Sequence, residues 1–187
     1  MLWAAVGCDG GAPIAEAAAL PPSPTAAPPT PVDIQPALRE ALPTAWAPLP
    51  TIARAAAEAA TAVDGVNVAA AAWGDPAAGC YLAVIDLRGT RRDVVRLVIE
   101  KLGWHLDAVA AMHAWRPPTA PVDPAVVTGE LTVGSSTGSV RAVISSDARS
   151  LPRAGLAACF HNEREPAACQ AVCARLLPQL QAPPVTP

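Results

Sequence analysis

The chain is poor in aromatic and in basic residues. Its 187 residues include one Tyr, one Phe and five Trp, and 16 acidic residues outnumber 13 basic ones. Nucleic-acid recognition usually depends on a Lys/Arg-rich face that neutralises phosphates, so a net charge of -3 argues against a nucleic-acid partner. The sequence has no apolar run of the roughly 20 residues that a membrane-spanning helix needs.

Familiar catalytic motifs are also missing. The sequence has no Gly-x-Ser-x-Gly elbow, no His-Glu-x-x-His pair, no Walker loop and no dinucleotide-binding fingerprint. His113 falls on an apolar helical stripe, which is typical of a structural histidine. The polar residues 161–165 fall at a helix start, where the positive end of the helix dipole stabilises carboxylates. We therefore expect a non-enzymatic protein without a cofactor, and an exported hydrolase is the alternative. The acid–base candidates in the sequence are His105, His113, His161, Glu163 and Glu165, and the hydrolase alternative uses the region of His161 and Glu163.

One cysteine lies close to the start of the chain, directly after the apolar residues 1–7. Ala5-Val6-Gly7-Cys8 resembles the lipobox of bacterial lipoproteins, in which a small residue precedes the cysteine that is acylated. The resemblance implies lipidation at Cys8 and a membrane-anchored place in the bacterial cell envelope, periplasmic or surface-exposed. The apolar run is short and has no Lys or Arg, so we interpret residues 1–8 as a truncated signal whose natural start lies upstream.

Composition then divides the rest of the chain. Eleven of the 22 prolines fall in the first 50 residues, which predicts a disordered Pro/Ala-rich linker over residues 9–48. In the polyproline II conformation, 40 such residues would span on the order of 100 Å. Residues 33–42 have the pattern of a short helix. We expect the folded domain over residues 49–182 and a disordered tail over 183–187.

Periodicity predicts an α+β domain, with a mostly antiparallel sheet of four or five strands and packed helices. The continuous apolar run at 81–87 is typical of a strand that is covered on both faces. The Gly- and Ser-rich residues 134–139 predict a hairpin turn. The expected helices are 50–64, 90–103, 107–115 and 165–180, and the expected strands are 66–73, 81–87, 126–133, 140–145 and 156–161.

Four more cysteines belong to the domain: Cys80, Cys159, Cys169 and Cys173. An even number in an exported chain favours two disulfides. Cys169 and Cys173 lie one turn apart on the buried stripe of the last helix, so a bond between them is disfavoured. Two pairings remain open: Cys159 with Cys169 and Cys80 with Cys173, or the same with the helix partners exchanged.

A zinc site is the alternative use of these side chains. Cys159 and His161 share one face of a strand, and Cys169 and Cys173 project from the helix, which would give a cytosolic zinc-binding adaptor four ligands. The spacing matches none of the familiar paired-knuckle patterns, so we expect no metal. The predicted function is a tethered binding or assembly module of the envelope, with the membrane and an envelope protein as partners. Nothing in the sequence predicts an oligomeric state.

Overall fold

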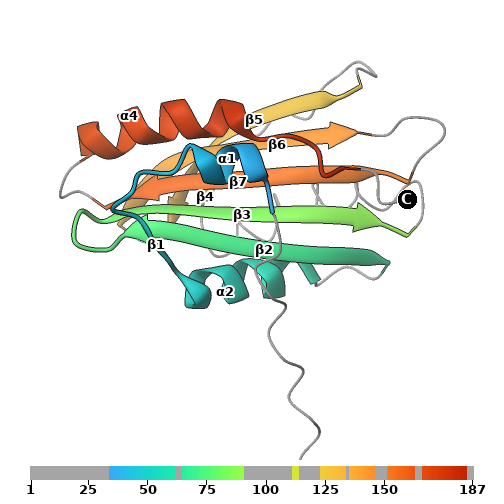
Figure 1. Ribbon diagram of the computed structural model, residues 1–187, viewed down its shortest axis with the longest axis horizontal. Helices are drawn as coiled ribbons and strands as arrows, with labels where there is room; N and C mark the ends of the chain where they lie inside the picture. Colours follow the sequence, from blue (N-terminus) through green and yellow to red (C-terminus); the bar gives the residue numbers. More distant parts are fainter. Residues whose placement is uncertain are drawn as a thin grey trace, which may run out of the picture. The chain divides into compact units, whose positions relative to one another are not determined.

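A computed structural model of the chain describes residues 34–61, 65–90, 111–113, 123–133, 135–145, 151–162 and 166–184. Contacts group Pro31–Pro187 into one unit, which holds all of the described residues. This unit is an antiparallel sheet with a few helices packed on it, as the sequence predicts (Figure 1).

The sheet has more strands than the sequence predicts. Seven strands of the described part of the chain pair in the order β1-β2-β3-β7-β6-β5-β4, and every neighbouring pair is antiparallel. The count of four or five was wrong, because it left out two short edge strands, β1 and β4. The strands are β1 (Ala47–Pro48), β2 (Val66–Asp75), β3 (Cys80–Gly89), β4 (Ala111–His113), β5 (Ala125–Val133), β6 (Ser136–Ser145) and β7 (Arg153–His161).

Strand β4 overturns part of a predicted helix. The sequence places a helix over 107–115, but Ala111–His113 pairs with Thr132–Glu130 of β5 instead. Backbone hydrogen bonding to a neighbouring strand overrides the helical spacing of so short a segment. The other residues of this predicted helix, 107–110 and 114–115, lie outside the described residues. The same is true of residues 91–103 of the predicted helix 90–103.

The helices are α1 (Pro36–Glu40), α2 (Pro50–Thr61) and α4 (Pro166–Leu176), and α4 continues into a 3-10 turn, η1 (Leu177–Gln179). Pro50 begins α2 because proline is tolerated in a helix's first turn, where its missing N–H is not needed. At the other end, α4 stops before Pro178, which cannot donate the hydrogen bond that an α-helix would require there.

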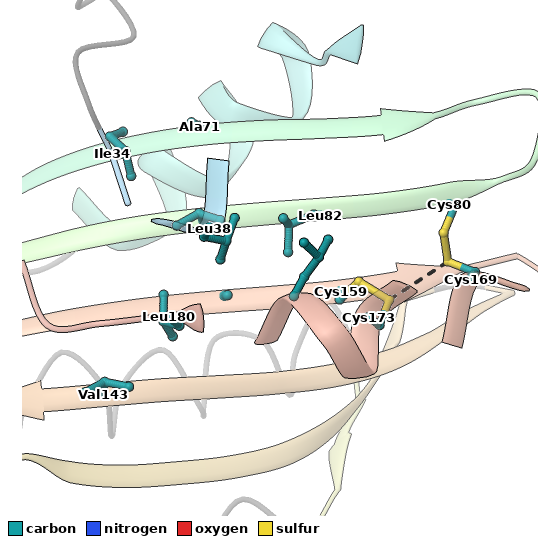
Figure 2. Packing of buried hydrophobic residues seen from close by; sticks show 13 residues of the cluster. Ile34, Leu38, Ala71, Cys80, Leu82, Val143, Cys159, Cys169, Cys173 and Leu180 are labelled. Atoms are coloured by element: carbon teal, nitrogen blue, oxygen red, sulfur yellow. Dashed lines mark hydrogen bonds between the residues drawn. A yellow bond between two sulfur atoms is a disulfide. The ribbon is translucent and has the colours of Figure 1, made fainter. Parts of the chain in front are cut away.

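Each face of the sheet has its own apolar core. Helix α2 covers one face, while α1 and α4 cover the other (Figure 1). Strand β3 contributes to both, because alternate side chains point to opposite faces: Ile85 and Leu87 pack on the α2 side, and Leu82 and Val84 on the α4 side. This confirms that the continuous apolar run of β3 belongs to a strand buried on both sides. Figure 2 shows the α4-side core, in which the four domain cysteines are packed.

The β2–β3 turn brings the start of β3 close to the end of β7. The Asp75 carboxylate accepts hydrogen bonds from the backbone N–H groups of Ala77 and Ala78, at 2.9 and 3.2 Å. Gly79 closes the turn with φ +67°, a conformation that glycine adopts without steric penalty. Its carbonyl accepts a 2.9 Å hydrogen bond from the Asn162 N–H, so Cys80 lies beside the last residues of β7.

The folded unit extends beyond the predicted boundaries at both ends. Ile34 and Leu38 of the expected linker are buried in the α4-side core, and α1 lies within the predicted 33–42 helix. Pro183, assigned to the tail, is fully buried, and its carbonyl accepts a 2.7 Å hydrogen bond from Arg153. The folded unit therefore begins before the predicted boundary at 48/49 and extends past the predicted boundary at 182/183.

Candidate functional site

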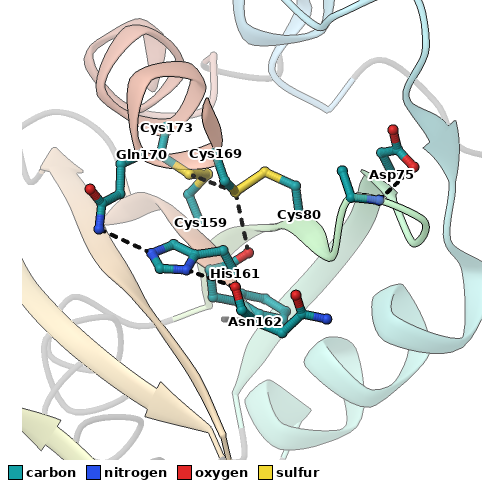
Figure 3. The surroundings of a disulfide bond; sticks show 10 residues. Asp75, Cys80, Cys159, His161, Asn162, Cys169, Gln170 and Cys173 are labelled. Carbon is teal, nitrogen blue, oxygen red and sulfur yellow. Dashed lines mark hydrogen bonds between the residues drawn. A yellow bond between two sulfur atoms is a disulfide. The ribbon is translucent and has the colours of Figure 1, made fainter. Parts of the chain in front are cut away.

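Two disulfides attach α4 to the sheet. Cys169 is bonded to Cys80 on β3, and Cys173 is bonded to Cys159 on β7, with Cα atoms 5.6 Å apart in both pairs (Figure 3). The prediction of two disulfides is confirmed. Of the two pairings left open, the structure has the one with the helix partners exchanged, so Cys159–Cys169 with Cys80–Cys173 was wrong.

The exchanged pairing follows from how the strands lie beside each other. In the β3–β7 register, Cys80 is opposite His161 and Cys159 is opposite Leu82. The two strand cysteines therefore lie on the same face, in adjacent rows and on adjacent strands. The spacing of Cys169 and Cys173 along the helix matches this diagonal, whereas sequence spacing alone cannot say which helix cysteine lies over which strand.

A pocket of about 360 Å³ opens beside α4. Strands β5, β6 and β7 form its floor and α4 with η1 forms one wall. The Cys159–Cys173 disulfide lies at the junction of floor and wall, so the same bond that fixes α4 also shapes the pocket. The lining residues are Glu130, Leu131, Thr132, Thr137, Gly138, Ser139, Cys159, His161, Gln170, Cys173, Ala174 and Leu177.

His161 is the buried polar residue of this pocket, with 6% of its surface exposed. Its Nδ1 lies 3.2 Å from the Asn162 carbonyl oxygen, which can only accept, so Nδ1 carries the proton. Its Nε2 lies 3.3 Å from the Gln170 side-chain nitrogen and accepts from it (Figure 3). The ring is therefore the neutral Nδ1–H tautomer, with both nitrogens engaged by the protein.

A second polar cluster lies on the α4 side of the sheet, where residues near the start of the folded unit contact residues near its end. The Gln35 side chain donates to the Asp86 carboxylate at 2.7 Å and to the Gln181 carbonyl at 2.8 Å, and it accepts from the Gln181 N–H at 2.9 Å. Gly155 makes room for this contact, because a Cβ there would collide with the Gln181 carbonyl. Gln35 thus ties α1, β3 and the C-terminal segment together.

Asp86 is buried in this cluster, with 7% of its surface exposed. Burial strips water from the carboxylate and raises the pKa of Asp86 above its ordinary value. The Gln35 hydrogen bond and the positive charge of Arg88 lower the pKa of Asp86, but by less than burial raises it. Asp86 helps to organise the fold and does not line the pocket.

Several predicted site residues lie outside the described residues: Cys8, His105, Glu163 and Glu165. His113 is on β4, where the register places it opposite Glu130, and not on the predicted helix. The cysteines of the zinc alternative are bonded in pairs, which leaves them no thiol for a metal. Among the described residues, no three His, Cys, Asp or Glu side chains are grouped as a metal site.

Two polar residues on the α4 side of the sheet, Glu130 and Asp86, were not predicted from the sequence as members of a polar cluster or pocket. Glu130 sits among apolar and Thr residues of a strand, and nothing in its own neighbourhood shows that it borders a pocket. Asp86 stands out as the only acid within the apolar run 81–87, but its partner Gln35 is 51 residues away in the sequence. An acid inside a buried strand is a signal that a polar partner exists, although spacing cannot identify that partner.

The chain matches no protein-family model, no curated protein and no solved structure. Within its described residues, no helix has the length and apolar character required to cross a bilayer.

Proposed function

We propose that this protein is an exported bacterial lipoprotein whose folded unit is a binding module in the cell envelope. Acylated Cys8 would attach it to a membrane, and the Pro/Ala-rich residues that follow would hold the folded unit away from the surface. Residues 9–33 alone would reach on the order of 80 Å in the polyproline II conformation. The pocket beside α4 is the binding site that we assign to this module.

The attachment of α4 is the observation that carries the proposal. Among the buried side chains of α4, Leu176 is the one large apolar residue, and the other two are Cys169 and Cys173. Burying a leucine contributes about 1.5–3 kcal/mol. Loop closure predicts about 3 kcal/mol for the Cys159–Cys173 bond and about 4.5 kcal/mol for the Cys80–Cys169 bond.

The pocket wall therefore depends on disulfides more than on apolar packing. Structural disulfides form and persist in oxidising compartments, such as the bacterial periplasm or the cell surface. A pocket built in this way suits a protein that works outside the reducing cytoplasm. This agrees with the compartment that the lipobox resemblance implies.

The state of His161 supports binding over catalysis. A general base needs a nitrogen lone pair that can reach the substrate's proton. In His161, Nδ1 donates to the Asn162 carbonyl and the Nε2 lone pair accepts from Gln170. Both nitrogens have protein partners, so the ring is better suited to shape the pocket than to move protons within it.

The membrane attachment can be tested on the protein isolated from its own cells. Intact-mass and N-terminal peptide analysis should find Cys8 as the first residue and acylated. A Cys8→Ala variant, expressed from the same gene in the same cells, should move from the membrane fraction to the soluble fraction. An unmodified thiol at Cys8, in a chain that keeps residues 1–7 and fractionates with the cytosol, would overturn the proposal.

A further inference from the structure

Several polar groups of the pocket beside α4 have no hydrogen-bond partner among the described residues: hydroxyls, which can accept or donate, and side-chain oxygens that only accept. The hydroxyls of Thr132, Thr137 and Ser139 make no side-chain hydrogen bond with the described residues. Gln170 uses its amide nitrogen on His161, which leaves its Oε1 with free lone pairs in the described part of the chain. A ligand rich in N–H and O–H donors would satisfy these groups.

The pocket also carries an unbalanced negative charge. Glu130 is the one carboxylate among the described lining residues, and no Lys or Arg is found among them. Its carboxylate forms no ion pair with the described residues. Arg141, two positions beyond Ser139 on β6, is not a lining residue. An anion would meet Glu130 without a compensating cation, whereas an ammonium group would find a counter-charge there.

The size of the pocket limits the ligand further. A volume of about 360 Å³ is near the lower end for small-molecule sites, which run from about 300 to 1,000 Å³. The apolar part of the described lining, including Leu131, Ala174 and Leu177, is about as large as the polar part and contains no aromatic side chain. The pocket therefore suits a compact molecule that carries several polar groups, and not a large apolar one.

We propose that the pocket binds a small hydroxylated organic cation, a ligand that combines an ammonium group with several hydroxyls. Glu130 pairs with the ammonium group, and Ser139, Thr137 and the Gln170 Oε1 accept from its N–H and O–H donors. His161 holds Gln170 in place through the Nε2 contact. This inference deepens the proposed function, because it names the ligand class for the same pocket.

Glucosamine is a suitable probe, and glucose is its matched control, since the two differ in the ammonium group at one ring position. Binding to the oxidised full chain is measured by NMR titration at constant pH and ionic strength. We expect saturable shifts at Ser139, Thr137 and Gln170 with glucosamine and much weaker ones with glucose. The affinity for glucosamine should fall as salt is added, because screening weakens the pair with Glu130.

Two variants test whether glucosamine binds in the pocket or elsewhere on the surface. Glu130→Gln keeps the shape of the side chain and removes its charge, and it should weaken glucosamine binding about three- to fivefold, as expected for an exposed ion pair. Glu58→Gln makes the same change on α2, on the opposite side of the sheet, and should leave binding unchanged. Neither variant removes a buried group, so both should fold.

Three results would overturn this inference: no saturable shifts with glucosamine, equal binding of glucose and glucosamine, or equal affinity in Glu130→Gln and the wild type. The titration uses purified protein with intact disulfides, so it does not depend on membrane attachment. Failure here would leave the lipoprotein proposal in place, and an unacylated Cys8 would leave the ligand class in place.

Discussion

Cys169 and Cys173 lie one helical turn apart with their sulfurs 4.0 Å from each other, yet each is bonded to a different strand. Cys169 is attached to β3 and Cys173 to β7, the middle strand of the seven and the neighbour of β3. One turn of α4 is therefore fixed at two points, which prevents the helix from pivoting about either bond. The pocket depends on this, since Gln170, Cys173 and Ala174 of α4 line its wall.

The two disulfides should differ in their contribution to stability. Cys80–Cys169 closes a separation of 89 residues and Cys159–Cys173 one of 14. Because the longer loop restricts the unfolded chain more, Cys80→Ala/Cys169→Ala should lower the free energy of unfolding by about 4.5 kcal/mol, and Cys159→Ala/Cys173→Ala by about 3 kcal/mol. Urea denaturation measures both. The reverse order would show that strain or packing, and not loop closure, dominates.

Reduction should release α4 before the sheet opens. Backbone hydrogen bonds, and not sulfur, join the nine residue pairs between β3 and β7, so this pairing should persist when the disulfides of Cys80 and Cys159 are reduced. Hydrogen exchange with and without a reductant should show faster exchange over Pro166–Leu176 and little change in α2, which no disulfide contacts. Equal protection of α4 in both states would mean that packing alone holds the helix.

The Gln35 side chain should contribute more to the free energy of unfolding than an exposed amide side chain does. Gln35→Ala removes three hydrogen bonds and leaves the buried Asp86 without its donor, so we expect a loss of about 2–3 kcal/mol in the free energy of unfolding. Gln179→Ala, on exposed η1, is the control and should be nearly neutral.

A glycine variant separates the backbone from the side chain at this position. Gln35 has φ +54°, in the left-handed region, where glycine pays no steric penalty. Gln35→Gly should therefore be roughly 1 kcal/mol less destabilising than Gln35→Ala. Equal losses in the two variants would contradict the assigned backbone conformation.

Asp86 should make stability depend on pH in a definite direction. Burial raises the pKa of Asp86 in the folded state, so its stabilising contribution is greatest below the unfolded pKa of about 3.9 and is lost as pH rises through the folded pKa. Asp86→Asn removes this titration and keeps an oxygen that can accept from Gln35. The variant should become progressively more stable relative to wild type as the pH rises between about 4 and 7, because only the wild-type carboxyl group must ionise while buried.

Urea denaturation of both proteins across that range provides the measurement. A difference between them that stays constant with pH, or that shifts in favour of the wild type as pH rises, would contradict a raised pKa for Asp86.

The sequence predicted those strands and helices whose formation depends mainly on residues close together in the chain. Periodicity and turn residues predicted five strands and two helices that the structure confirms: β2, β3, the hairpin strands β5 and β6, β7, α2 and α4. The boundary at 48/49 was wrong because Ile34 and Leu38 are two apolar residues within a Pro-rich composition, and an average over the segment hides them. Strand β4 was missed because its pairing with β5 is a tertiary contact.

Of the candidate site, the sequence predicted the two disulfides and singled out His161 as a polar candidate, but it did not predict the pocket that these residues line. The cysteine count and the i, i+4 spacing gave two disulfides, but the choice of partners depends on which strand lies under which turn of α4. Glu130 and Gln170 come together through strand order and helix placement, which leave no trace in the sequence around either residue. The same holds for Gln35 and Asp86.

Peptide mapping of the protein isolated from its own cells, alkylated before digestion without reductant, tests the central claim most directly. The account predicts two cross-linked peptides, one joining Cys80 to Cys169 and one joining Cys159 to Cys173, with no alkylated thiol at any of the four positions. Four alkylated cysteines in the folded native protein would contradict it, because α4 and the pocket wall would then be held without disulfides.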